Sequence, residues 1–487
     1  MRSKGKTSPI SYYDKLSGKT VLAVLFLLAL FIRFPFFFRD YIDRDESTFI
    51  LVGQALADGY LPYTFLWDLK PPLVFFIIGG LISIFGKSFI AIRLFGTIAV
   101  CLTAFFTYKI GGHVFSKKIG IWSSLGAVLL LSLFGSLQGV MSEHISMLFF
   151  IPGLYFLVKS RNNSNVVLSG LLIGMALMTK INLAYAALFL TLFLLVAGVR
   201  TASWKQGLMR SLLFGASNLI VILLTLLPYY LTGKADAWWK SVFLAPLEYT
   251  SAEPFSPEKI LPFIILITAF FLFAWKKHKL NFENPNAQLL LIALAGVCFS
   301  FIKGGKVNGH YLIQVYPILL LFVGAFLSAL PHLKKWNWAP VMLVLLFLLP
   351  VESYREYYAI ITHKRERGTY FNGEGIRVPQ YLLAEGLNTE NVLFLEYHIG
   401  YWLLDKMPPT LAATHPSNLC REELFPFFDN PRRTTIEELK FIMEDLKPAT
   451  VVIRKNKRIF DKEEVEANQY VQQYLQKFYA LQNSIDA

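Results

Sequence analysis

The chain has 487 residues and a formal net charge of +14. Hydrophobic residues make up 55% of it and charged residues only 16%, against about 25% in soluble domains. This composition excludes an ordinary soluble protein and favours an integral membrane protein. The three cysteines lie far apart, so neither a disulfide framework nor a cysteine metal site is expected.

The charge is unevenly distributed along the chain. Residues 351–487 contain 17 Lys and Arg against 20 Asp and Glu, whereas residues 1–350 contain 30 against 13. A basic membrane part is typical of cytoplasmic loops that follow the positive-inside rule. Nucleic acid is therefore not needed as a partner, and none is expected.

Apolar segments predict about eleven transmembrane helices, since a crossing needs about 20 residues. Short basic connections such as Lys117-Lys118 and Lys276-Lys277 indicate the cytoplasmic side. With the N-terminus cytoplasmic, eleven crossings place the chain after residue 350 outside, in the periplasm of a bacterial inner membrane. The expected spans are 20–38, 91–112, 119–138, 145–158, 166–180, 182–198, 208–228, 259–275, 287–302, 311–330 and 338–350.

The apolar stretch 73–86 is not counted as a span. It has 14 residues, and a crossing there would reverse the side of every later loop. We interpret it as an interfacial or re-entrant helix. Residues 39–90 then form one outer loop with juxtamembrane helices.

The last 137 residues have a different pattern. VLFLEY (392–397) and TVVIRK (450–455) resemble buried strands, whereas 436–446 and 465–481 have helical spacing of apolar residues. Such alternation predicts a small extracytoplasmic α/β domain over 351–487. Residues 1–350 are expected to form the transmembrane catalytic domain.

An acidic pair, Asp45-Glu46, opens an amphipathic segment in the first outer loop. Asp45 is a natural N-cap for that helix. It is also a candidate general base, because a carboxylate at the membrane surface can accept a proton from a hydroxyl group. The residues alone leave both interpretations open.

Lys70 precedes Pro71-Pro72, which favour an extended and stiff backbone. Such a lysine can extend its amine to lipid head groups, or it can bind a phosphate. Arg93, at the outer end of the next span, is a candidate second cation for the same phosphate.

Further ionisable residues are expected on the same outer face, where such groups are functional candidates. No spacing of ligands supports a metal site, so no cofactor is expected. These candidates are Asp68, Glu143, Lys180, Lys303, Lys306, His310 and Tyr311.

The order Asp45-Glu46, amphipathic helix, Asp68-x-Lys70-Pro-Pro-Leu, Phe85-Gly86 and Arg93-Leu94 resembles the type C glycosyltransferases. It is most similar to the superfamily of protein O-mannosyltransferases and lipid A aminoarabinose transferases, and residues 20–112 carry this resemblance. The resemblance implies an inverting transfer of a sugar from a polyprenyl-phosphate donor to a hydroxyl group on the outer face. The acceptor would be a glycolipid, a glycan or a protein.

The same resemblance implies roles for individual residues. Asp45 would be the general base, Glu46 its neighbour in the acceptor or helix-cap site, and Lys70 a ligand of the lipid phosphate. Two alternatives stay open: a transporter or flippase of an anionic lipid, and an oligosaccharide polymerase or ligase with a pyrophosphate-linked donor. Transporters more often place ionisable residues near the membrane midplane, which favours the enzyme.

Overall fold

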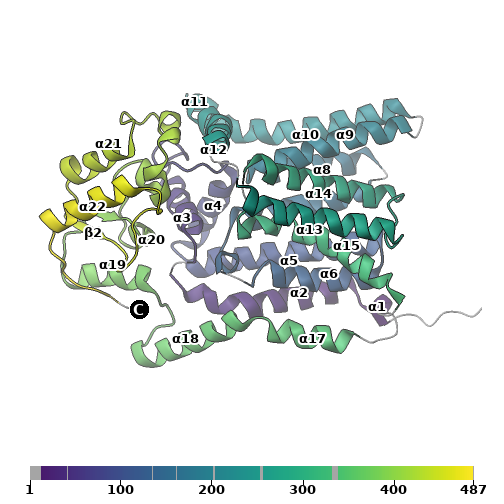
Figure 1. Cartoon of the computed structure of the whole chain (residues 1–487), viewed down its shortest axis with the longest axis horizontal. Coiled ribbons are helices and arrows are strands. Elements are labelled where there is room, and N and C mark those ends of the chain that lie inside the picture. Colours follow the sequence, from purple (N-terminus) through teal and green to yellow (C-terminus); the bar gives the residue numbers. More distant parts are fainter. Residues whose placement is uncertain are drawn as a thin grey trace, which may run out of the picture.

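The computed structural model describes residues 12–485 apart from 41, 134, 161, 201–202, 253–255, 306 and 332–337. Most of the described residues are helical, and the apolar helices run side by side (Figure 1). Each of the expected spans overlaps one of these helices. They are α2 (Gly18–Arg33), α5 (Phe89–Val114), α6 (Lys117–Leu130), α7 (Ser142–Val158), α8 (Asn163–Leu177), α9 (Ala184–Arg200), α10 (Trp204–Leu231), α13 (Pro257–Lys276), α14 (Pro285–Lys303), α15 (Tyr316–Ser328) and α17 (Ala339–Leu348).

Within the described residues, five helical segments are long and apolar enough to cross a membrane by themselves. The other apolar helices of the bundle have 10–17 residues when α13 is counted from Ile260, which is less than a straight crossing requires. The structure is therefore a helical membrane fold, and the count of eleven crossings stays a prediction. The five segments are Gly18–Phe38, Phe89–Val114, Ile181–Gly198, Trp204–Leu231 and Pro285–Lys303.

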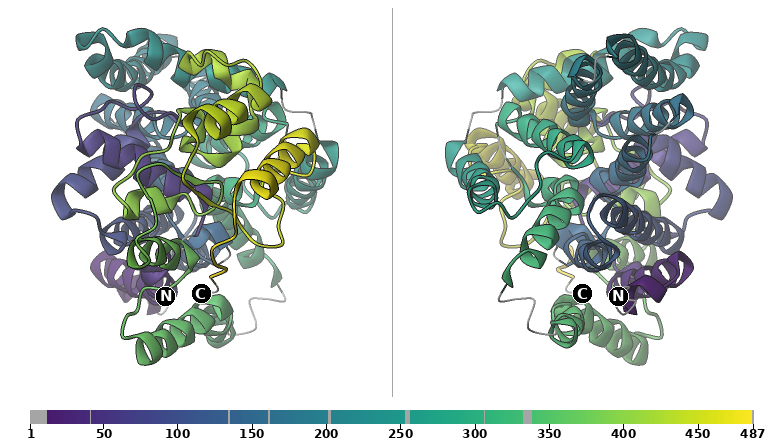
Figure 2. Two further views of the ribbon diagram at one scale, coloured as in Figure 1. Left: turned by 90° about the vertical axis from the view of Figure 1, so that its left-hand side faces the viewer. Right: turned by 90° about the vertical axis from the view of Figure 1, so that its right-hand side faces the viewer.

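The two ends of the bundle carry different parts of the chain. The short helix α1 (Tyr12–Lys15) lies at the start of α6, where Lys118 Nζ is 5.6 Å from the ring centroid of Tyr13. The chain after residue 351 covers the opposite end (Figure 1), and Figure 2 shows the bundle nearly along its helices. Lys117-Lys118 and the C-terminal region thus lie at opposite ends, as the expected topology requires.

Two helices of the first loop, α3 (Arg44–Ala57) and α4 (Leu73–Phe85), lie between the bundle and the C-terminal region (Figure 1). They approach closely because glycines face each other. A Cβ atom on Gly79 would lie 2.8 Å from the carbonyl oxygen of Gly53, a distance that real Cβ contacts do not reach. The 13-residue α4 is short for a straight crossing, in line with an interfacial or re-entrant helix.

The C-terminal region is helical with a small parallel sheet. Its strands β1 (Val392–Phe394) and β2 (Thr450–Val452) lie inside the two expected strand segments and pair with Val392 opposite Thr450. The short helices α11 (Ala235–Trp239) and α12 (Ala245–Ala252) of the preceding part lie beside this region (Figure 1). The helices of the region are α18 (Val351–Arg367), α19 (Glu374–Ala384), α20 (Ile399–Leu403), α21 (Thr435–Lys440) and α22 (Val465–Phe478).

The C-terminal region shares one hydrophobic core with the first loop. Phe49 of α3 and Phe75 of α4 belong to the same buried cluster as Leu393 and Tyr401. Polar contacts join the same surfaces, including a 2.7 Å ion pair between Arg44 and Glu396. The two parts are therefore packed together, and a division into separate domains at residue 350 stays a prediction.

Candidate active site

Helix α3 is capped by Asp43 and not by Asp45. The Asp43 carboxylate accepts a hydrogen bond of 2.9 Å from the backbone N–H of Asp45, and its backbone is extended as an N-cap requires. The interpretation of Asp45 as the N-cap is therefore wrong. Its side chain is left for other contacts, at the end of the helix where the dipole favours negative charge.

Lys70 is held by contacts on both sides of its backbone. The hydroxyl of Tyr63 donates a 2.6 Å hydrogen bond to the Lys70 carbonyl, and Pro72 caps the start of α4. The backbone N–H of Leu73 donates to the carbonyl of Met178, which ties this turn to the end of α8. The turn therefore presents the Lys70 amine from a fixed backbone.

Asp45, Lys70 and Asp68 form one ionic cluster. The Lys70 amine lies 3.2 Å from Asp45 Oδ2 and 3.8 Å from Asp68 Oδ2. Burial alone would raise the pKa of Asp45, but Lys70 and His415 outweigh it and hold that pKa well below its usual range. Burial opposes the charge of Lys70 too, but Asp45 and Asp68 raise its pKa above the usual value. Both groups are therefore ionised near neutral pH.

A second group of predicted residues lies next to the first. The Lys180 amine is 2.6 Å from Glu143 Oε1 and 4.9 Å from the centre of the Tyr311 ring, while His310 Nε2 is 3.9 Å from the same Glu143 oxygen. Glu143 is fully buried, whereas His310 is partly exposed. The Lys180 charge is among those that lower the pKa of Asp45, so the two groups share one electrostatic environment.

Glu46 and Arg93 form a separate, buried cluster. Arg93 donates from all of its nitrogens to Glu46 and to the backbone carbonyls of Phe36, Arg39 and Asp40. Glu46 also accepts a 2.9 Å hydrogen bond from the backbone N–H of Val140. These contacts use all five guanidinium donors, so the geometry does not support the expectations that Arg93 binds the donor phosphate and that Glu46 acts in catalysis.

Two further candidates do not join the cluster. Lys303 is exposed at the end of α14 and forms no ion pair with an acidic residue in the part of the chain that the structure describes. Lys306 lies outside the described residues. Within those residues, no group of three or more His, Cys, Asp or Glu side chains is arranged to hold a metal ion.

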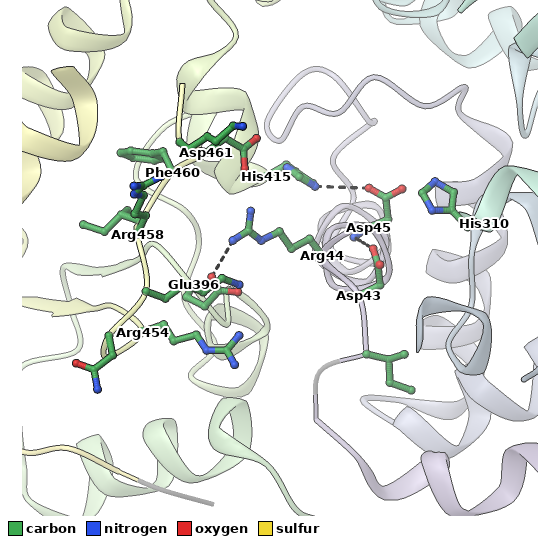
Figure 3. Close-up of a pocket in the computed structure, with 15 residues that line it drawn as sticks. Asp43, Arg44, Asp45, His310, Glu396, His415, Arg454, Arg458, Phe460 and Asp461 are labelled. Atoms are coloured by element: carbon green, nitrogen blue, oxygen red, sulfur yellow. Dashed lines mark hydrogen bonds and ion pairs between the residues drawn. The ribbon is translucent and has the colours of Figure 1, made fainter. Parts of the chain in front are cut away.

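The C-terminal region contributes a residue that the sequence did not indicate. His415 is buried, and its Nε2 lies 3.5 Å from Asp45 Oδ1 (Figure 3). Asp45 thus has Lys70 at one carboxylate oxygen and His415 at the other. No local pattern marks His415, because its partner is hundreds of residues earlier in the chain.

Asp45 opens onto a cavity of about 690 Å³ between α3 and the C-terminal region (Figure 3). Asp45, His310 and His415 line it on one side. The chain after β2 lines the other side and adds the exposed cations Arg454, Lys457 and Arg458. A deprotonated carboxylate, a buried amine and a solvent-connected cavity can together accept a proton and stabilise a phosphate leaving group.

Comparisons with known proteins show what the sequence and the fold are similar to. Residues 69–230 match the family described as dolichyl-phosphate-mannose-protein mannosyltransferase. The structure of ArnT from Cupriavidus metallidurans bound to undecaprenyl phosphate aligns with a TM-score of 0.51 and 15% sequence identity, over 87% of this chain and 76% of that chain. The family match covers about a third of the chain, and the alignment with ArnT shows a similar fold. The matched segment includes Lys70, Glu143 and Lys180.

Two more structures align with lower scores. ArnT from the same organism in the apo state has a TM-score of 0.48 and 15% identity, over 88% of this chain and 78% of that chain. The Archaeoglobus fulgidus oligosaccharyltransferase in complex with Zn and sulfate has a TM-score of 0.42 and 12% identity, over 81% and 58%. A comparison of this chain with curated protein sequences finds no significant match.

Proposed function

We propose that this protein is a glycosyltransferase that transfers a sugar from a polyprenyl-phosphate donor to a hydroxyl group of an acceptor on the outer face of a bacterial inner membrane. The observation that carries the proposal is the 3.2 Å ion pair between Lys70 Nζ and Asp45 Oδ2. It places a cation suited to a phosphate beside a carboxylate suited to a proton. The similar fold of ArnT bound to undecaprenyl phosphate supports a ligand of this class.

The ion pair suggests an order of events. When a donor phosphate binds Lys70, the amine interacts with the phosphate and stabilises the ionised form of Asp45 less than before. The pKa of Asp45 then rises, because burial favours its neutral form. Without a donor, the low pKa of Asp45 keeps its carboxylate ionised. Donor binding raises this pKa and so makes the carboxylate a stronger base.

The transfer itself then balances in one step. The acceptor hydroxyl gives its proton to Asp45 while its oxygen forms a bond to the anomeric carbon. The bond from that carbon to the phosphate oxygen breaks, and polyprenyl phosphate leaves with the electron pair beside Lys70. Attack from the face opposite the phosphate inverts the anomeric centre.

The position of the cluster favours transfer over transport. Asp45 lies in the first turn of α3 and Lys70 just before α4, and both helices lie at the end of the bundle that the C-terminal region covers (Figure 1). Transporters more often place such groups near the membrane midplane. The 690 Å³ cavity next to Asp45 offers the acceptor a route that does not cross the bundle. An acceptor hydroxyl on a glycolipid, a glycan or a protein can enter there.

The proposal is tested with purified protein, synthetic polyprenyl-phosphate sugars and acceptors from the cell envelope, with product detected by mass spectrometry. Asp45→Asn keeps the size of the side chain but cannot accept the proton, so turnover should fall by about 10²–10⁴-fold with donor affinity retained. Asp58→Asn, the same substitution at the exposed far end of α3, is the matched control. Turnover by Asp45→Asn equal to that of the control, or passage of intact donor across vesicles without transfer, would reject the proposal.

A further inference from the structure

His415 is held in a defined orientation at the edge of the C-terminal region. It caps the short helix Pro416–Cys420, and its Nδ1 accepts a 3.1 Å hydrogen bond from the backbone N–H of Ser417. A neutral imidazole carries one proton. Since Nδ1 is the acceptor, the proton is on Nε2, which is the nitrogen that faces Asp45 Oδ1 at 3.5 Å.

The segment around His415 is fixed to the first loop by a second contact. The backbone N–H of Trp67 donates to Thr414 Oγ1, and the indole of Trp67 packs 4.8 Å from the ring of Phe428. Trp67 lies between Asp45 and Lys70 in the sequence and is fully buried. The segment that carries His415 is therefore fixed against the first loop, and it holds the imidazole in place beside Asp45.

We propose that His415 is a positioning residue, whose Nε2–H holds Oδ1 of Asp45 while Oδ2 accepts the proton of the acceptor hydroxyl. This inference rests on the proposed function of Asp45. In the resting site, Lys70 and His415 hold one carboxylate oxygen each. Once a donor phosphate occupies Lys70, His415 is the partner that still orients the base. Such contacts are often long without substrate and shorten when it binds.

His415 does not itself carry the proton away. Its Nδ1 is engaged by Ser417, and its Nε2 already holds a hydrogen. The proton from the acceptor therefore stays on Asp45 until the product leaves. The C-terminal region thus completes the site by orienting the base.

A pH profile separates this role from simple packing. Without the Nε2–H donor, the ionised form of Asp45 loses a stabilising contact, and the acid limb of kcat/KM should move to higher pH. The other groups around Asp45 stay in place in such a variant. They are Lys70 and Asp68 before α4, Glu143 on α7, Lys180 after α8, His310 near α15, His398 before α20, and Asp43 and Arg44 at the start of α3.

The experiment compares His415→Leu, which removes the donor, with His415→Gln, whose amide can replace it, and with His363→Leu on α18 as a matched control. For His415→Leu we expect kcat to fall about tenfold, which is about the effect of losing one hydrogen bond to a charged group. The acid limb of kcat/KM should also shift, and donor affinity should not change. His415→Gln should have most of the wild-type kcat and an acid limb of kcat/KM near the wild-type pH. Equal losses in both His415 variants, or a wild-type profile in His415→Leu, would overturn the inference.

A measurement on the wild-type protein needs no variant. Nitrogen NMR of labelled histidine should show the proton on Nε2 of His415, and a proton on Nδ1 would also overturn the inference. The two proposals fail in different ways. An active Asp45→Asn variant rejects the proposed function, whereas an inactive Asp45→Asn beside an unaffected His415→Leu rejects only the role of His415.

Discussion

Glu46 Oε2 and Arg93 Nη2 form a 2.9 Å ion pair in which neither side chain is more than 3% exposed. Glu46 follows Asp45 directly, yet the two carboxylates face different surroundings. Asp45 opens onto a cavity, whereas Glu46 joins α3 to α5 and to the backbone of Val140. Adjacent acids in one motif thus lie in different environments, one buried in an ion pair and the other at a cavity.

The buried pair should act on stability. Arg93→Met leaves Glu46 as an uncompensated buried charge, so we expect a loss of about 3–5 kcal/mol in the free energy of unfolding. Replacing both partners, as Glu46→Gln with Arg93→Met, should cost less than the single change. Arg39→Met breaks a more exposed pair with Glu356 and should cost only about 0–1 kcal/mol. Unfolding in detergent measures all three, and a stable Arg93→Met with weakened donor binding would return Arg93 to the phosphate site.

Lys70 should act on donor binding and on the rate of transfer. On the proposed function, Lys70→Ala removes the cation that meets the leaving phosphate, and we expect a loss of about 10²–10³-fold in kcat together with weaker donor affinity. Lys70→Arg should recover only part of this, because the planar guanidinium differs in shape and hydrogen bonding.

The control for these variants is Lys87→Ala, which removes a lysine paired with the exposed Asp405. Single-turnover rates and donor affinities are measured for all three. If Lys70→Ala behaves as Lys87→Ala does, Lys70 interacts only with lipid head groups.

The lowered pKa of Asp45 predicts an acid-tolerant enzyme. A carboxylate whose pKa falls on folding stabilises the native state above its unfolded pKa of about 3.9, and this contribution is lost as the pH falls through the lower folded value. The kcat/KM of the wild type should therefore persist from neutral pH to below about 4. In Lys70→Met the acid limb of kcat/KM should move to higher pH, because burial raises the pKa of Asp45 and Lys70 no longer counters it. Coincident limbs for the two proteins would show that Asp45 does not govern the profile.

The topology is tested by cysteine labelling. Cys101, Cys298 and Cys420 are replaced by serine, and single cysteines are introduced at Glu390 of the C-terminal region and at Lys277 after α13, both of which are exposed. An impermeant maleimide should label the cysteine at position 390 in intact cells and the cysteine at position 277 only after permeabilisation. The reverse pattern would place the candidate site in the cytoplasm.

Local sequence signals were sufficient for much of the architecture. Apolar length predicts where helices lie, and the alternation of strand and helix patterns after residue 390 predicts β1, β2 and α22. The Lys70-Pro-Pro turn also follows from local sterics, because proline restricts its neighbours. These features depend on residues a few positions apart.

Contacts between distant segments were not predictable in this way. The choice of Asp43 over Asp45 as the cap depends on where α3 begins, and element boundaries are the least reliable part of a sequence prediction. The partner of Glu46 lies 47 residues away on α5. His415 gives no signal at all, since a lone histidine before a proline is typical of many loops. It comes near Asp45 only because the C-terminal region packs on α3.

That packing also determines the stage of synthesis at which His415 can reach Asp45. Thr48 and His398 are 350 residues apart in sequence and form a 3.0 Å contact in the finished fold. A ribosome must therefore make most of the chain before the segment that carries His415 can pack against Asp45. On the proposed function, a nascent chain holds Asp45 and Lys70 for most of its translation without an oriented base, so lipid-linked sugar is not consumed until the segment around His415 has been made.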